Sequence, residues 1–162
     1  MHELGVAILR AVMRRLRGRS ALRRFITVAS ALHLAMLRAS GGRLGRRLGL
    51  TSATILVLTT TGRRTNLPRR VPLLALQDGA SFVIAASYGG LDVAPGWFHN
   101  LVALPEAVVE IDGRRQRVRA EPVPEEDRGA TWARFVRAFP GYADYQARTR
   151  RRIPLLVLRP AD

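Results

Sequence analysis

The sequence contains no cysteine and no lysine, and it has no run of eighteen apolar residues. The absence of cysteine excludes disulfides, thiolate catalysis and cysteine-based metal sites. The short apolar runs argue against a membrane-spanning protein, and the N-terminus lacks the uninterrupted apolar core and small-residue cleavage site of a signal peptide. We therefore expect a cytoplasmic protein.

The charge is strongly unbalanced. All 27 basic residues are arginines, against 12 acidic residues, which gives a formal net charge of +15. Complete replacement of lysine is most simply a coding bias, but it does not change the sign of the charge. Such a surface attracts nucleic acid, anionic lipid or a polyanionic small molecule. With 162 residues, the chain is long enough for one domain with its own core.

The pattern before about Thr51 is helical. Leu4, Ile8 and Val12 recur at helical spacing with arginines between them, and a second helical run ends at Ser40-Gly41-Gly42. A basic amphipathic helix can lie on the anionic inner face of the plasma membrane, or it can pack on the domain or on a partner subunit. We expect residues 1–45 to form a basic helical segment and residues 46–162 to form the folded domain, and a homodimer is a reasonable expectation.

After Thr51 the pattern is typical of strands. Apolar runs at 55–58, 71–76, 82–86, 107–111 and 153–158 predict strands, and Gln77–Ala80 and Asp112-Gly113 are hairpin signals. Helices are expected in PGWFHNLVAL and over residues 125–139. Tight hairpins with singly inserted helices, and no regular βαβ alternation, predict an α+β fold with an antiparallel barrel instead of a Rossmann sheet.

Four arginines follow the first predicted strand in the stretch TTTGRRTNLPRR. The stretch is neither a Walker loop nor a dinucleotide fingerprint. It offers threonine hydroxyls, backbone NH groups near Gly62 and guanidinium groups, which suit phosphate or carboxylate because a guanidinium binds either group in bidentate fashion. The alternative is an arginine-rich loop solvated by water.

Three further stretches are candidates for a site. The glycines of Ser87-Tyr88-Gly89-Gly90 would let a flat ligand approach the backbone, or they form an ordinary turn. The aromatic residues of Gly96–Asn100 suit either a ligand or the core. Tyr142 and Tyr145 stand three residues apart and would share one side of a helical turn, where a tyrosine can act as a general acid or can simply be buried.

The remaining chemistry is sparse. His2, His33 and His99 are scattered, so no metal site is expected. No carboxylate pair, Ser-His-Asp order or activated nucleophile is present. Any chemistry is therefore expected to belong to a bound cofactor, which the protein orients.

Four motifs together resemble one known family. TTTGRRTNLPRRVPL, FVIAASYGG, PGWFHNLVALP and FPGYADYQARTRRRIPLLVL, in this order, are similar to the deazaflavin-dependent nitroreductase family of actinobacterial reductases. The resemblance runs from about Leu32 to the C-terminus. It implies a split β-barrel of the FMN-binding type that binds coenzyme F420, a deazaflavin with a phosphate and an oligoglutamate tail.

The resemblance also implies roles for individual residues. Arg63, Arg64 and Thr65 would hold the phosphate and tail, and Tyr142 would donate a proton after hydride transfer. The implied catalytic residues are Tyr142, Tyr145 and Ser87. The implied cofactor-binding residues are Thr60, Thr61, Gly62, Arg63, Arg64, Thr65, Asn66, Arg69, Ser87, Tyr88, Gly89, Gly90, Trp97 and Asn100.

Two positions depart from the family pattern. Asn66 stands where glycine is usual, and asparagine also tolerates a positive φ. Tyr88 replaces a lysine that is frequent after the serine, which removes one cationic contact.

The implied function is an F420H2-dependent oxidoreductase that transfers a hydride to a quinone, an enone or a nitroaromatic acceptor. Two alternatives remain open. One is an FMN-dependent split-barrel reductase, and the other is a basic module that binds a membrane or nucleic acid without catalysis. The interleaving of arginine with apolar residues near the N-terminus fits membrane better than nucleic acid.

Overall fold

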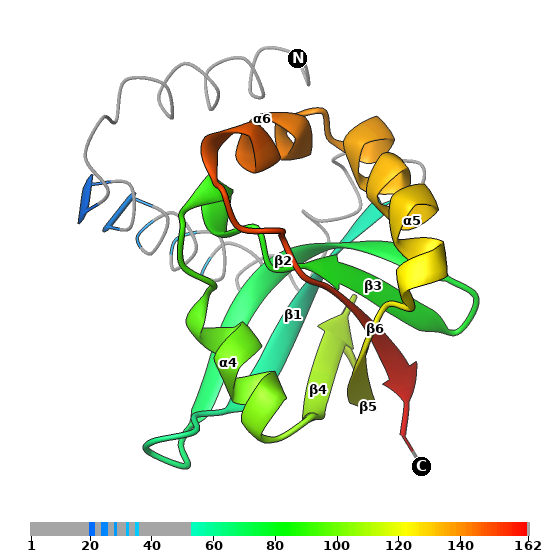
Figure 1. Ribbon diagram of the computed structural model, residues 1–162. Coiled ribbons are helices and arrows are strands. Elements are labelled where there is room, and N and C mark those ends of the chain that lie inside the picture. Colours follow the sequence, from blue (N-terminus) through cyan, green and yellow to red (C-terminus); the bar gives the residue numbers. More distant parts are fainter. Residues whose placement is uncertain are drawn as a thin grey trace.

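The computed structural model describes residues 53–161 without interruption, and before them the helical residues Ser20, Ala21, Arg24, Phe25, Val28, Leu32 and Ala35. Residues 53–161 form a strand barrel with helices on its outside and at one mouth (Figure 1). The strands are β1 (Ala53–Thr61), β2 (Pro68–Asp78), β3 (Ser81–Ala85), β4 (Glu106–Ile111), β5 (Arg114–Pro122) and β6 (Leu155–Pro160).

The six strands close into a barrel in the order β1-β2-β3-β6-β5-β4. Every neighbouring pair is antiparallel, including the β1–β4 pair that closes the barrel. Closure leaves no unpaired strand edge in the barrel. The predicted α+β fold with an antiparallel barrel is confirmed.

Two of the hairpins are the ones that the sequence predicted. Asp112 and Gly113 connect β4 to β5 with φ angles of 49° and 78°, so both central residues adopt the left-handed conformation of a type I′ turn. Gly79, with φ 60°, turns the chain from β2 to β3. Glycine and aspartate reach this conformation at little steric penalty, which is why these turns could be read from the sequence.

The barrel wall separates two cores. Inside it, one cluster includes Leu56, Leu58, Ile84, Val109 and Leu158, each at most 1% exposed. A second cluster lies outside β3 and β6, and its buried members are Leu76, Val83, Ala85, Phe135, Tyr142, Ile153, Leu155 and Val157. Successive side chains of a strand alternate between its faces. Because both faces are covered, the runs at 82–86 and 155–158 are continuously apolar.

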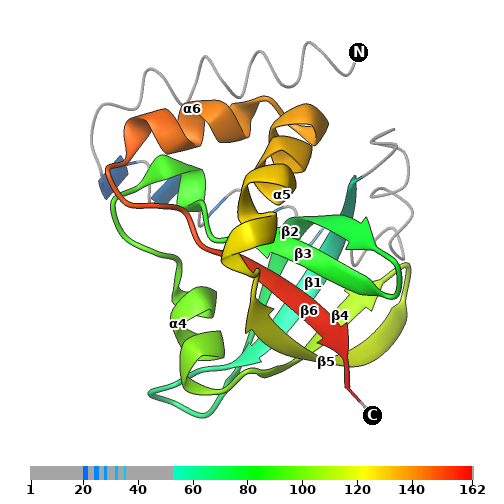
Figure 2. The ribbon, with the colours of Figure 1, turned by 45° about the vertical axis from the view of Figure 1, so that its right-hand side comes forward.

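Helices supply the covers. Helix α5 (Glu125–Ala138) and helix α6 (Gly141–Arg148) lie over the outer face of β3 and β6, as Figures 1 and 2 show. The short α4 (Gly96–Ala103) buries Trp97 and Leu101 in the barrel core, beside the loop that joins β1 to β2. A single 3-10 turn, η1 (Tyr88–Gly90), follows β3. Glu125, Glu126 and Asp127 begin α5, where negative charge complements the helix dipole.

Some predicted boundaries differ. The last strand begins at Leu155, two residues later than expected, because Pro154 has no NH to give to a strand ladder. Strand β1 extends beyond its apolar run on both sides, to Ala53 and Thr61. The predicted N-terminal helical segment, with its membrane contact, lies almost entirely outside the described residues. Within the described part of the chain, no helix is both long enough and apolar enough to span a bilayer.

Candidate functional site

The β1–β2 loop is a compact turn built on Gly62. The Gly62 NH donates to the Leu67 carbonyl at 2.9 Å, and the NH groups of Thr65 and Asn66 donate to the Gly62 carbonyl at 3.1 and 2.8 Å. A Cβ on Gly62 would lie 2.8 Å from the Thr65 hydroxyl oxygen, so a side chain does not fit here. Asn66 has φ 54°, as the sequence predicted for a residue in a glycine position.

Asn100 of α4 ties this loop to the barrel. Its side-chain Nδ2 donates to the Thr60 hydroxyl at 3.0 Å, and its Oδ1 accepts the Arg63 backbone NH at 3.2 Å. Thr60 and Asn100 are both buried, and buried polar pairs of this kind fix geometry because neither group has water as an alternative partner. The loop therefore holds a defined position relative to α4.

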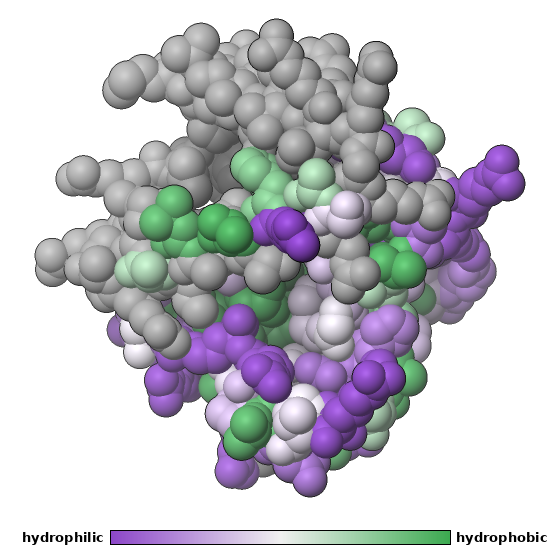
Figure 3. All heavy atoms as spheres, turned by 90° about the vertical axis from the view of Figure 1, so that its left-hand side faces the viewer, coloured by the Kyte–Doolittle hydropathy of each residue, from purple (hydrophilic) through white to green (hydrophobic). Residues whose placement is uncertain are grey.

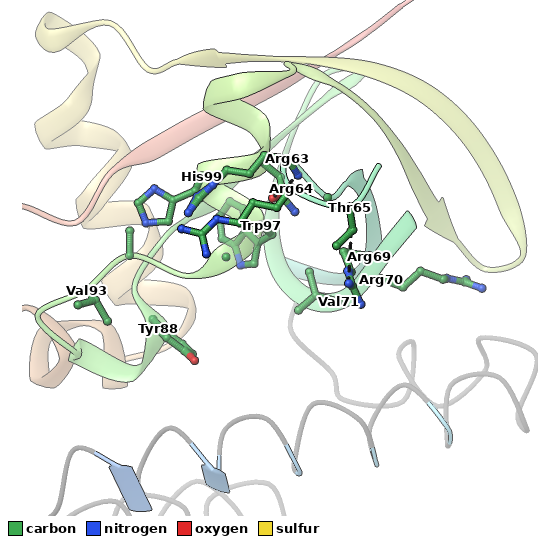
Figure 4. A pocket seen from close by; sticks show the side chains of 14 residues that line it. Arg63, Arg64, Thr65, Arg69, Arg70, Val71, Tyr88, Val93, Trp97 and His99 are labelled. Carbon is green, nitrogen blue, oxygen red and sulfur yellow. Dashed lines mark hydrogen bonds between the residues drawn. The ribbon is translucent and has the colours of Figure 1, made fainter. Parts of the chain in front are cut away.

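A cavity of about 630 Å³ opens between this loop, α4 and the segment after β3 (Figure 4). In the close view, Arg63, Arg64 and Trp97 lie in the middle of the lining, with Tyr88 and Val93 facing them from the other side. The full lining is Gly62, Arg63, Arg64, Thr65, Arg69, Arg70, Val71, Tyr88, Val93, Ala94, Gly96, Trp97, His99 and Asn100.

The lining carries uncompensated positive charge. Arg63, Arg64 and Arg69 are exposed, and none of them has a carboxylate partner among the described residues. Arg69 donates only to the Thr65 hydroxyl, at 3.4 Å. Figure 3 shows hydrophilic side chains gathered on the lower part of the face that bears the loop and α4. The cavity is therefore suited to an anion.

Arg70 is the one cavity arginine with a described carboxylate partner. Its Nη2 donates to Glu110 Oε2 at 2.9 Å, across strand β1. Its Nε is buried and has no hydrogen-bond partner in the described structure. A buried donor without a partner is unfavourable.

Eight of the predicted cofactor-binding residues line the cavity, and they are Gly62, Arg63, Arg64, Thr65, Arg69, Tyr88, Trp97 and Asn100. The lining does not include the other six, and they are Thr60, Thr61, Asn66, Ser87, Gly89 and Gly90. Thr60 is 1% exposed and acts through its bond to Asn100. The Ser87 side chain is buried as well. A direct cofactor contact for these six residues stays a prediction.

The two predicted catalytic tyrosines lie in the second core. Their rings are in contact, with centroids 5.5 Å apart, as their spacing on a helical turn predicted. Tyr142 also contacts the rings of Trp132, Phe135 and Phe139, and it is 6% exposed. Burial, and to a lesser extent Tyr145, raises the pKa of Tyr142 above its ordinary value, so its phenol stays protonated. The structure does not place either tyrosine in the cavity lining, and their catalytic role stays a prediction.

Sequence reasoning assigned no role to several residues of the lining. Val93 and Ala94 carry no chemical signal, and they reach the cavity only because the chain turns there before α4. His99 is exposed on α4, and its ring meets the Phe98 ring edge-on with the two ring centroids 5.7 Å apart. Arg70 was part of the noted arginine cluster without being assigned. Within the described residues, no group of three or more potential metal-ligating side chains occurs.

Comparisons with known proteins identify the family of the chain. Residues 29–160 match the family model described as F420H(2)-dependent quinone reductase. A protein of Mycobacterium tuberculosis named F420H(2)-dependent quinone reductase is 38% identical over an alignment of 132 residues, and the match covers 78% of this chain and 87% of the relative. A Mycobacterium bovis protein with the same description, there marked putative, has the same identity and coverage.

Solved structures agree as well. An F420-H2 dependent reductase superposes with a TM-score of 0.60 at 32% identity, covering 65% of this chain and 93% of that one. A protein described as a domain-swapped dimer gives the same score and identity, covering 79% of that chain. The predicted membership, which rested on four motifs, is thus confirmed by matches over most of the sequence. This chain belongs to the F420H(2)-dependent quinone reductase family.

Proposed function

We propose that this protein is an oxidoreductase that uses reduced F420 to reduce a quinone. The observation that carries the proposal is the group of three arginines, Arg63, Arg64 and Arg69, beside Trp97 at the cavity, with no carboxylate partner in the described structure. Both the family of the chain and its mycobacterial relatives support the same cofactor and acceptor class.

The residues present fit F420. The coenzyme carries a phosphate and an oligoglutamate tail, and guanidinium groups are the side chains best suited to bind both phosphate and carboxylate. Trp97 and Tyr88 add aromatic surface for a planar ring. The cavity volume of about 630 Å³ lies within the range of cofactor and ligand sites.

The contribution of the protein is binding and orientation. When it is bound, reduced F420 supplies the hydride. Arg63 and Arg64 would hold its anionic groups, while Asn100 keeps their loop in place through the Arg63 NH. Holding two reactants in a fixed relative orientation lowers the entropic part of the activation barrier of a bimolecular reaction, and this can contribute several kcal/mol.

Reduction of a quinone also requires a proton. Tyr142 remains our candidate donor from the family resemblance, although its ring packs in the second core. If the phenol gives the proton, Tyr142→Phe should reduce turnover more than it reduces cofactor affinity. Unchanged turnover would mean that water or another residue supplies it. Acceptance of enones or nitroaromatic compounds, as the resemblance implied, belongs to this same proposal and is tested with the same assay.

The direct test mixes the purified protein with reduced F420 and menadione and follows the return of the visible absorption of oxidised F420. A parallel reaction contains reduced FMN in place of reduced F420. We expect protein-dependent oxidation with F420 and none above the blank with FMN. Oxidation of reduced FMN alone would overturn the cofactor assignment in favour of an ordinary flavin reductase.

Two further properties are proposed, one from a solved relative and one from the sequence pattern. The solved relative described as a domain-swapped dimer supports a homodimer, which the molar mass in solution would test. Association of the N-terminal segment with anionic membranes rests on its sequence pattern, and sedimentation with anionic vesicles would test it.

A further inference from the structure

The segment that joins β3 to α4 has an unusual backbone. Tyr88, Gly89 and Gly90 have φ angles of 49°, 65° and 80°, so three successive residues adopt the left-handed conformation. Glycine does so readily, but for a bulky residue such as tyrosine the conformation is an outlier that persists only where the surrounding structure enforces it. Of these three residues, Tyr88 is the one that lines the cavity.

One side chain, that of Arg151, bonds both ends of the segment. Its Nε donates to the Leu91 carbonyl at 2.8 Å, and its Nη2 donates to the carbonyls of Ala86 and Ser87, each at 2.8 Å. Figures 1 and 2 both show the connection from α6 to β6 running beside this segment. The fork of a guanidinium can span carbonyls on both sides of Tyr88, which a single point charge cannot.

The surroundings of Arg151 keep this bridge in place. The Gln146 side chain donates to the Arg151 carbonyl at 3.0 Å and accepts the Ile153 NH at 3.2 Å. Thr149 donates to Asp92 at 2.9 Å, which adds a second tie between the two segments. Burial lowers the pKa of the Arg151 guanidinium and Asp92 opposes that shift, but an arginine remains charged in either case.

The two segments are also packed without spare room. A Cβ on Gly90 would lie 2.6 Å from the Tyr145 carbonyl oxygen and 3.1 Å from the Arg148 Cβ. Gly90 therefore lets the backbone of η1 rest directly on the end of α6. The contact leaves Arg151 within reach of all three carbonyls.

We propose that Arg151 is a positioning residue that holds Tyr88 against the cavity. By bonding the carbonyls before and after Tyr88, it keeps the backbone in the left-handed conformation, and the tyrosine ring forms the wall that faces Arg63 and Arg64 (Figure 4). The proposal rests on the proposed function, because the ligand that this wall contacts is F420. Arg151 itself does not line the cavity.

The test is a double-mutant cycle read as the dissociation constant of oxidised F420. The proteins are the wild type, Arg151→Met, Tyr88→Asn and the double variant. Asparagine removes the ring but tolerates the left-handed conformation. We expect about ten-fold weaker binding for each single variant, and a double variant within about two-fold of either one, since residues that act as a unit are not additive. A hundred-fold loss in the double variant would mean independent effects and would overturn the proposal.

Two controls separate geometry from charge. Arg152→Met removes the neighbouring arginine, whose described partner is the exposed carboxylate of Glu125, and it should leave F420 binding unchanged. Arg151→Lys keeps the charge but not the fork, and it should bind as weakly as Arg151→Met. If Arg151→Met does not fold, Arg151→Lys takes its place in the double-mutant cycle. Full recovery of binding with lysine would overturn the proposal.

A second readout does not depend on F420. The NH groups of Gly90 and Leu91 donate to the carbonyls of Ser87 and Tyr88 at 3.0 and 3.3 Å, so hydrogen exchange reports on η1 directly. Loss of Arg151 should speed exchange at these two amides and leave the barrel amides unchanged. Equal exchange in the two proteins would overturn the proposal. If the wild type binds no F420, the proposed function fails, while this measurement still decides whether Arg151 fixes the segment.

Discussion

Two groups of arginines on this molecule differ in what surrounds them. On the outer face of the barrel, Arg115 and Arg159 lie 3.0 and 2.8 Å from Glu110 and Glu121, and Arg119 pairs with Glu106. At the cavity, three arginines have no carboxylate partner in the described part of the chain, and they are Arg63, Arg64 and Arg69. Each group contains three arginines, so the two groups carry the same formal positive charge.

Pairing, more than number, distinguishes a surface that binds an anion from one that is solvated by water. An exposed arginine beside a glutamate has its field largely cancelled and contributes little to either stability or ligand binding. An arginine without such a partner keeps its full hydrogen-bonding capacity for an anion, and several of them converging on one cavity add their attractions.

Charge reversal tests this contrast most strongly. Arg64→Glu should weaken F420 binding by more than about a hundred-fold, because a charged hydrogen bond is lost and a repulsion is added. Arg117→Glu makes the same change in net charge on the exposed face of β5, and it should alter binding by less than about two-fold because Arg117 does not line the cavity. Equilibrium dialysis gives both constants. Equal losses would mean that the overall charge, and not the cavity, attracts the cofactor.

Loop geometry is the next test. Gly62→Ala places a Cβ 2.8 Å from the Thr65 hydroxyl and 3.1 Å from the Leu67 carbonyl, so the loop must shift and F420 binding should weaken by about ten-fold. Gly129→Ala is the matched change in the exposed middle of α5, where the new methyl meets nothing within 4 Å. It should stabilise the fold by about 0.5–1 kcal/mol and leave binding unchanged. Undiminished binding by Gly62→Ala would remove the loop from the site.

Salt should separate the two groups of arginines in the wild-type protein. Between about 0.05 and 0.5 M sodium chloride, F420 affinity should fall several-fold, because screening weakens the attraction of the exposed cavity arginines for an anion. The thermal midpoint should change little, because exposed ion pairs on the barrel face each contribute about 0–1 kcal/mol. Affinity that does not depend on salt would contradict a mainly electrostatic site.

The smallest expected effect is on the pH dependence of stability, and it comes from Tyr142 in the second core and not from the cavity. Burial raises the pKa of Tyr142, so above pH 10 the unfolded chain loses this proton while the folded chain keeps it. The free energy of unfolding should therefore be unaffected by this group below its unfolded pKa and should fall as the pH rises beyond it. Tyr142→Phe should show a shallower fall in denaturant titrations from pH 9 to 11. Identical slopes would mean that Tyr142 ionises equally in both states.

The sequence predicted the strands and hairpins well because their signals are local. Asp112-Gly113 identifies its turn by itself, and the continuous apolar runs at 82–86 and 155–158 indicate strands covered on both faces. The arginine loop was predicted for the same reason. Its charge and its glycine are neighbours in the chain.

What the sequence could not give depends on tertiary contacts. Arg151 is one of four arginines within residues 148–152. Nothing in the local sequence marks it as the one that bonds three carbonyls. The spacing of Tyr142 and Tyr145 predicted a shared side of a helix but not which core that side would face. The bond from Asn100 to the Thr60 hydroxyl joins residues 40 positions apart, and no local pattern indicates it.

The most direct measurement is a titration of oxidised F420 against three proteins, namely the wild type, Arg63→Gln with Arg64→Gln, and Arg119→Gln with Arg159→Gln, whose described partners do not line the cavity. Each double variant removes two positive charges, from the cavity in one case and from the barrel face in the other. We predict about a hundred-fold weaker binding for the cavity variant, from two charged hydrogen bonds of about 1.5 kcal/mol or more each, and wild-type affinity for the barrel variant. Equal affinity of all three proteins would contradict it.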